Sequence, residues 1–234
     1  CFMTVRYTKY RYTTRLFFWV MFLGLTVSAS AATAREPGVY QERALAAPTQ
    51  DFSALGLKDC QQTLSLDSEH YLAVCRLATP ATTAGLRLVL VDTGRSGQSA
   101  ILFQSPDFGD AYYVKLSVFS KDQRDGPDLV LAESGAEFSY GIRVYTVNHS
   151  KLHFVGDLDA VLDRDGVASS VAPALRITDT GREVAFTFTD NVMLPDRKGN
   201  YTEVAPNHLR YVLSGSKLRR LVSVQGVTRG RTAH

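Results

Sequence analysis

The sequence lacks the short motifs by which many enzymes and cofactor-binding proteins are identified. It contains no phosphate-binding loop, no dinucleotide fingerprint and no G-x-S-x-G turn. Histidine is scarce, with five residues, and the pair His149 and His153 lies across a predicted turn with no third ligand for zinc. We therefore predict neither a resident metal nor a cofactor, and no motif names a reaction.

The first 34 residues have the composition of a secretory signal peptide. Four basic residues and no acidic residue come first, an apolar run follows over residues 16–27, and small residues fill 28–34. The alternative is an uncleaved membrane anchor, because residues 16–34 are all uncharged, although their second half is small and polar. We predict export to the periplasm or the cell exterior, with no stable membrane insertion after signal cleavage.

Removal of this leader changes both the charge and the aromatic content of the chain. The full chain has 26 Lys and Arg and 23 Asp and Glu, and the leader takes four of the basic residues, which leaves 22 against 23. A net charge of −1 provides no broad positive surface for a polyanion, so we predict no nucleic-acid partner. The single tryptophan, Trp19, also lies in the leader, and a sugar-binding surface would lose its stacking residue.

Beyond the leader, the sequence predicts one all-β domain. Residues 35–56 show no strand rhythm and are predicted to be a linker or irregular segment, residues 57–224 a single β domain, and residues 225–234 a basic C-terminal tail. Short apolar runs alternate with turn residues through the domain, as in antiparallel proteins. We predict an antiparallel meander of about twelve short strands, in a sandwich or an open propeller-like arrangement, at residues 62–66, 71–77, 86–91, 100–104, 112–120, 128–132, 138–147, 152–155, 174–177, 183–189, 209–213 and 218–224.

Two cysteines, Cys60 and Cys75, remain after the leader. They flank two strand-like runs, residues 62–66 and 71–77, with a turn between them. In such a hairpin the two cysteines lie nearly opposite each other, near its open end, which is close enough for a disulfide. An exported domain with two cysteines most simply forms one bridge, so we predict Cys60–Cys75.

The tetrapeptide Asp-Thr-Gly-Arg occurs twice, at residues 92–95 and 179–182, each time between apolar strands. With its apolar lead-in at 89–91, the first copy resembles the Asp-Thr-Gly turn of aspartic proteases, which are exported all-β enzymes with one such turn in each lobe. The resemblance implies that Asp92 and Asp179 share a proton and activate a water. This alternative interpretation gives an aspartic-type peptidase.

The two copies also have the chemistry of ordinary hairpin turns. The aspartate can accept hydrogen bonds from the turn, and the glycine can adopt positive φ. Arg95 and Arg182 depart from the protease pattern, in which a small residue follows the glycine, and an arginine beside each carboxylate would lower its pKa. We favour the turn interpretation, with no catalytic residue.

A cluster of aspartates before a glycine resembles a calcium-binding loop. Carboxylate oxygens are the ligands that hard cations prefer, but no further acidic residue follows Gly166, as it does in the usual loop. The candidate ligands are Asp157, Asp159, Asp163 and Asp165.

Taken together, these features predict an exported, non-enzymatic binding or interaction domain. Its ligand would be a protein or a glycan, neither of which the sequence identifies. The aspartic-type peptidase is the alternative, and the separation of the Asp92 and Asp179 carboxylates distinguishes the two.

We expect the exported protein to begin near Ala32 or Arg35, because two small-residue triplets, residues 29–31 and 32–34, fit signal peptidase. Intact-mass analysis of exported material checks this. Exported protein that retains residues 1–34 would contradict the prediction.

Overall fold

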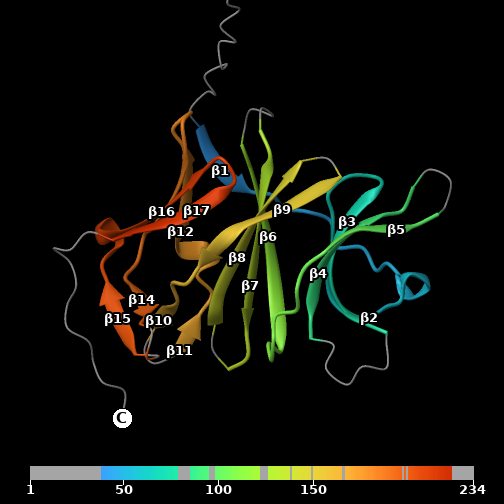
Figure 1. Ribbon diagram of the computed structural model, residues 1–234, viewed down its shortest axis with the longest axis horizontal. Coiled ribbons are helices and arrows are strands. Elements are labelled where there is room, and N and C mark those ends of the chain that lie inside the picture. Colours follow the sequence, from blue (N-terminus) through green and yellow to red (C-terminus); the bar gives the residue numbers. More distant parts are fainter. Residues whose placement is uncertain are drawn as a thin grey trace, which may run out of the picture. The chain divides into compact units, whose positions relative to one another are not determined.

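The computed structural model describes residues 38–78, 85–94, 98–121, 126–137, 139–148, 150–164, 167–196, 198 and 200–222, with the backbone alone at 163, 164 and 167–169. These residues form seventeen strands in four antiparallel sheets and three short 3-10 helices (Figure 1). The strands are β1 (Gly38–Glu42), β2 (Leu57–Ser65), β3 (His70–Leu77), β4 (Arg87–Asp92), β5 (Ala100–Gln104), β6 (Tyr113–Lys121), β7 (Asp128–Gly135), β8 (Ser139–Asn148), β9 (Lys151–Leu158), β10 (Leu162–Arg164), β11 (Val167–Ser169), β12 (Leu175–Asp179), β13 (Val184–Phe188), β14 (Val192–Pro195), β15 (Tyr201–Val204), β16 (Leu209–Ser214) and β17 (Lys217–Val222). The 3-10 helices are η1 (Ser53–Leu55), η2 (Ala172–Ala174) and η3 (Pro206–His208).

The all-β, antiparallel class predicted from the sequence is confirmed. The twelve predicted strands correspond to β2–β9, β12, β13, β16 and β17. Five further strands, β1, β10, β11, β14 and β15, have only three to five residues, too few to show an alternating pattern. None of the helices in the described ranges has the length and apolar character needed to cross a membrane.

One expectation is corrected at Gly38–Glu42, which was predicted to lie in a linker or irregular segment. These residues form β1, which pairs with β12 on one side and with β6 on the other. The strand has no alternating pattern, because it buries only Tyr40 while the apolar Val39 is exposed and Gln41 and Glu42 follow one another. Its partners lie far along the chain, so no local pattern marks it.

Nine strands form one strongly curved sheet in the order β17-β16-β13-β12-β1-β6-β7-β8-β9. Its two edge strands, β9 and β17, come into contact, so the sheet is a nearly closed barrel (Figure 1). The two smaller sheets, β10-β11 and β14-β15, are two-stranded hairpins. The contact between β9 and β17 brings the two edges of the nine-stranded sheet next to each other.

The seam between β9 and β17 is held by side chains, since the described residues form no strand pairing there. Gly156 on β9 lies under Leu218 on β17, and a Cβ at Gly156 would come within 2.7 Å of Leu218 Cβ. Asp159, just after β9, accepts hydrogen bonds from the Tyr211 hydroxyl and from Arg220. Burial, together with the Asp159 carboxylate, raises the pKa of the Tyr211 phenol, so this donor keeps its proton.

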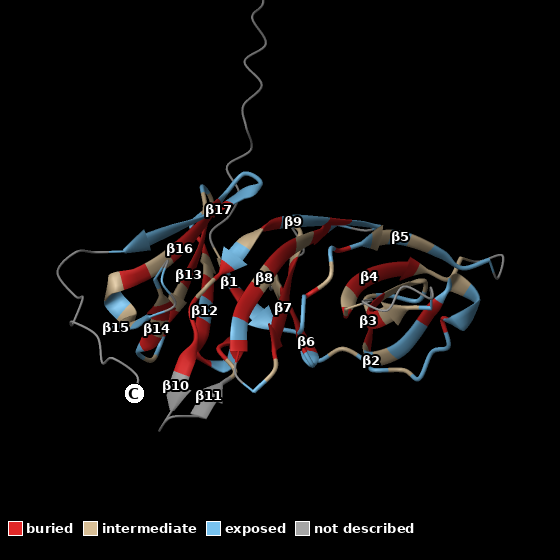
Figure 2. Ribbon diagram, turned by 60° about the horizontal axis from the view of Figure 1, so that its bottom comes forward, coloured by how far each residue is buried: buried red, intermediate tan, exposed pale blue. Residues whose placement is uncertain are grey.

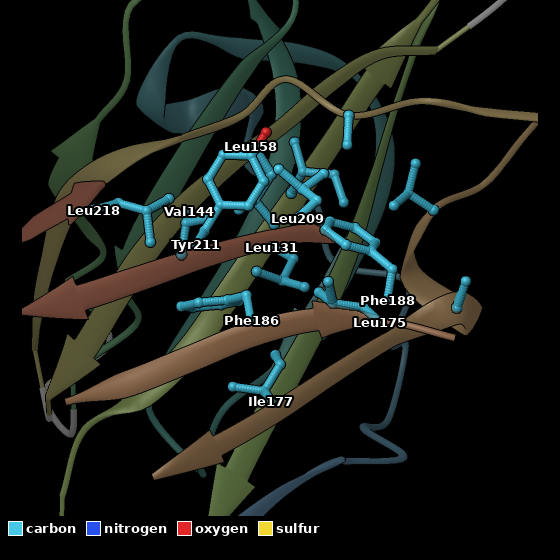
Figure 3. Packing of buried hydrophobic residues seen from close by; sticks show 14 of the residues in the cluster. Leu131, Val144, Leu158, Leu175, Ile177, Phe186, Phe188, Leu209, Tyr211 and Leu218 are labelled. Carbon is cyan, nitrogen blue, oxygen red and sulfur yellow. The ribbon is translucent and has the colours of Figure 1, made fainter. Parts of the chain in front are cut away.

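The barrel interior is a packed apolar core. Alternate residues of each strand point inward, and Figure 3 shows Leu131 and Val144 facing Phe186, Phe188 and Tyr211 across it. The Phe188 and Tyr211 rings meet edge to face, with centroids 6.2 Å apart. This packing fills the middle of the barrel, so any binding site has to lie at an end or on the outside.

The four-stranded sheet, in the order β2-β3-β4-β5, packs on the outer face of barrel strands β6–β9. Side chains from both layers form one buried cluster, which includes Leu72, Leu88, Leu116, Val130 and Tyr145. Figure 2 shows the buried residues of β3 and β4 in red. This face-to-face contact corresponds to the sandwich arrangement, with a barrel wall as one of its layers.

A buried carboxylate, Glu133 on β7, fastens a connecting segment to the barrel. Its residue exposure is 2%, and it accepts hydrogen bonds from Ser139 Oγ at 3.0 Å, Ser170 Oγ at 2.6 Å and Val171 N at 3.0 Å. Three donors offset the desolvation of a buried acid. Glu133 therefore fixes the segment that leads into η2 against the barrel wall.

The predicted disulfide is confirmed: Cys60 on β2 is bonded to Cys75 on β3. Pairing between β2 and β3 shifts between Lys58 and Gln62, and Asp59 has a positive φ of 49° in this bulge. The bulge sets Cys60 opposite the buried Cys75.

We expect the double substitution Cys60→Ala and Cys75→Ala to lower the free energy of unfolding by about 3 kcal/mol, because the bridge closes a loop with a sequence separation of 15. Urea unfolding of the purified protein under non-reducing conditions measures this. Wild-type protein reduced with dithiothreitol is the matched control and should unfold at the midpoint of the double variant. Equal midpoints for oxidised wild type and the variant would refute the expectation.

Candidate functional site

A cavity of about 140 Å³ opens at one end of the barrel, which we call the mouth. It lies where β1 is inserted between β12 and β6 and where the β12–β13 and β16–β17 turns meet the start of β7. Its lining residues are Tyr40, Pro127, Leu129, Thr146, Asp179, Gly181, Arg182, Glu183, Val184, Leu213 and Gly215.

The wall of the mouth contains a buried ion pair between Lys121 and Asp179. Lys121 Nζ lies 3.2 Å from Asp179 Oδ2, and the two side chains are 5% and 1% exposed. Lys121 ends β6 and Asp179 ends β12, and both continue the inward-facing positions of their strands. Because β1 separates these strands, the lysine side chain has to cross it to reach the carboxylate.

Gly38 makes this crossing possible. Gly38 pairs with Asp179, and Tyr40, two residues further along β1, pairs with Lys121. A Cβ at Gly38 would lie 3.0 Å from Lys121 Cε, so the lysine stem occupies the space that a larger side chain would take. Glycine at this position therefore allows a charged pair to close over the end of the joining strand.

The rim of the mouth is polar and the floor is apolar. Arg210 donates a hydrogen bond to Glu183 on the rim, and the Tyr40 hydroxyl donates to the Pro127 carbonyl at 3.3 Å. Leu129, Val184 and Leu213 form the floor. Such a concave surface, apolar with a few placed polar groups, is typical of ligand sites, although this cavity is smaller than those for drug-sized ligands.

The two Asp-Thr-Gly turns have the same local geometry, with the hydrogen bond and the glycine conformation expected of such turns. Asp92 Oδ1 accepts a hydrogen bond from the Gly94 amide at 2.8 Å, and Asp179 Oδ1 accepts one from the Gly181 amide at 2.7 Å. The glycines have φ values of 54° and 82°. Each aspartate thus closes its own turn through an amide two residues ahead.

The structure does not bring Asp92 and Asp179 together. Asp92 ends β4 of the four-stranded sheet, whereas Asp179 ends β12 of the barrel. Figures 1 and 2 place β4 and β12 on opposite sides of the described chain. A shared proton needs two carboxylates a few ångströms apart, and Asp179 instead has a lysine beside it.

Of the four calcium candidates, only Asp157 and Asp159 are described with their side chains. Asp157 is exposed on β9, and Asp159 accepts hydrogen bonds across the seam. Asp163 is described by its backbone alone, in β10, and Asp165 lies outside the described residues. Over the described part of the chain, no three His, Cys, Asp or Glu side chains gather closely enough to hold a metal ion.

Sequence reasoning missed the mouth because its lining residues come from five separate stretches of the chain. One signal was present in β6. Residues Val114, Leu116 and Val118 pack against the four-stranded sheet, while Ser117 and Phe119 face the barrel interior, so both faces of the strand are buried. A lysine at the next inward position, Lys121, is the kind of buried charge that requires a partner.

We expect Asp179→Asn to destabilise the protein by about 3 kcal/mol or more, because it leaves the buried Lys121 ammonium without this carboxylate. Asp92→Asn is the matched control, since it changes the same turn chemistry away from the ion pair, and it should cost about 1 kcal/mol or less. Thermal and urea unfolding of both variants measure the difference. Similar losses in the two variants would show that the ion pair contributes little.

Comparison with known proteins provides no relative. No family model matches the chain, and no curated protein and no solved structure matches it either. The geometry of the chain's own residues therefore carries the functional proposal.

Proposed function

We propose that this protein is an exported, non-enzymatic binding domain, and that the mouth of its barrel receives the ligand. The observation that carries the proposal is the cavity of about 140 Å³, with an apolar floor and a charged rim, at the end of an otherwise packed barrel. The packed interior stabilises the barrel, and the cavity at its end is a surface on which a ligand can bind.

Two features support export. The leader at residues 1–34 has the order of a signal peptide. The disulfide between Cys60 and Cys75 is of the kind that persists in oxidising compartments, such as the periplasm or the cell exterior. Both features are compatible with a periplasmic or secreted protein.

The peptidase alternative has no geometric support. Its two carboxylates lie in different sheets, and both are engaged in turn hydrogen bonds. Asp179 is also paired with Lys121, and a nearby cation favours the ionised carboxylate over a shared proton. Binding without catalysis is therefore the function that the site favours.

We expect small fragments to bind at the mouth and to shift the backbone amide resonances of Tyr40, Thr146 and residues 179–184. The measurement is protein-observed NMR of the exported protein with a library of anionic, cationic and neutral fragments. Thr146→Trp should abolish these shifts, because Thr146 lines the cavity and an indole fills it.

Thr178→Trp provides the matched control. Thr178 precedes Asp179 on β12, alternates to the outer face and pairs with the exposed Val39, so an indole there leaves the cavity open. Fragment shifts that avoid the mouth, or that survive Thr146→Trp, would overturn the proposal. So would the absence of any shift from all three fragment classes.

A further inference from the structure

The charges at the mouth do not balance. Lys121 pairs with Asp179, and Arg210 pairs with Glu183, so two cations and two anions neutralise each other. Among the described charged residues that line the cavity, Arg182 alone forms no hydrogen bond or ion pair. It is solvent-exposed at the rim, and the described mouth therefore carries one uncompensated positive charge.

We propose that the mouth binds the C-terminal residue of a partner protein, with Arg182 holding the free α-carboxylate and the apolar floor holding a short aliphatic side chain. This inference rests on the proposed function, because it assigns a ligand class to the same cavity. It follows from the unpaired guanidinium and the apolar floor of the cavity.

Arginine is suited to this ligand because its planar guanidinium donates two parallel hydrogen bonds to a carboxylate. Thr146 also lines the cavity, and a threonine side chain carries a hydroxyl that can donate a further hydrogen bond. The neighbouring Glu183 accepts a hydrogen bond from Arg210. Because this carboxylate already has a cationic partner, the Arg182 guanidinium can bind the carboxylate of the ligand.

The apolar floor favours a chain terminus over an acidic sugar, which is the other common source of a carboxylate. Leu129, Val184 and Leu213 offer no partner to ring hydroxyl groups, which would lose hydrogen bonds to water on burial. A short aliphatic side chain carries no such groups and can pack on this floor.

The test uses the exported protein and four probes: acetyl-Ala-Ala-Val with a free C-terminus, the same peptide as its C-terminal amide, acetyl-Ala-Ala-Glu with a free C-terminus, and glucuronate. We expect the free-acid valine peptide to shift the mouth resonances. The amide should bind at least tenfold more weakly because it lacks the charge. The glutamate peptide should also bind more weakly, because its side chain cannot be buried on an apolar floor.

Arg182→Gln should weaken binding of the free-acid valine peptide roughly tenfold to hundredfold, the range expected for hydrogen bonds to a charged group. Arg182→Lys should restore only part of it, because an ammonium lacks the fork geometry. Arg176→Gln is the matched control, since Arg176 lies on the same strand, β12, with its exposed side chain on the outer face. Unchanged melting temperatures establish that all three variants are folded.

The possible results distinguish a failure of the C-terminus assignment from a failure of the proposed binding function. Equal binding of acid and amide at the mouth would refute the carboxylate assignment and leave the binding function standing. Glucuronate binding at the mouth without peptide binding would keep the carboxylate and overturn the protein partner. Equal losses in Arg182→Gln and Arg176→Gln would refute the role of Arg182. If neither these probes nor any fragment shifts the mouth resonances, the proposed function fails with the inference.

Discussion

Five residues, Gly38–Glu42, join the two halves of the barrel. On one side of β1 lie β6–β9, and on the other lie β12, β13, β16 and β17, each group connected mainly through neighbours in sequence. Apart from the side-chain seam between β9 and β17, hydrogen bonding between these groups in the described sheet passes through β1. The curvature, the packed interior and the cavity at the mouth all depend on this strand being in place.

The mouth shows how a joining strand can also shape a site. Because β1 is short and begins with glycine, the inward-facing residues at the ends of β6 and β12 can meet over it as an ion pair. Breaking a buried pair leaves a charge without its partner, which is costly, so the pair fixes the positions of both strand ends. The turn after Asp179 then presents Arg182 and Glu183 at the rim from a rigid base.

The features that the sequence could predict are those that depend on residues close together in the chain. Strands such as 112–120 and the hairpin that carries Cys60 and Cys75 have local alternation and local turns, and all were confirmed. The turn role of Asp92 and Asp179 depends on amides two residues away, so it was also accessible. By contrast, the pairing of Tyr40 with Lys121 and with Ile177 depends on contacts across most of the chain, and no composition or spacing signals it.

The same reasoning explains why the mouth of the barrel was not among the candidate sites. Aspartates are candidate catalytic or metal-binding residues in any sequence. Here Asp92 closes a turn, Asp159 accepts hydrogen bonds across the β9–β17 seam, and Asp179 pairs with Lys121. In the sequence, Arg182 stands out only as a departure from a protease pattern. Whether its guanidinium is free to bind an anion depends on which neighbouring charges are already paired, and those pairs are formed by residues that lie far apart in the sequence.

The position of β1 also bears on the order in which the chain can fold. One of its partners, residues 119–121, lies near the middle of the chain, and the other, residues 177–179, comes late, so the loops that have to close before the barrel exists are long. Local hairpins such as β2–β3 and β7–β8 gain their contacts at small entropic cost, whereas β1 gains its first partner only with residue 121 and its second only with residue 179. During the early part of synthesis β1 therefore has no strand to pair with, and the barrel can close only after most of its strands have been made.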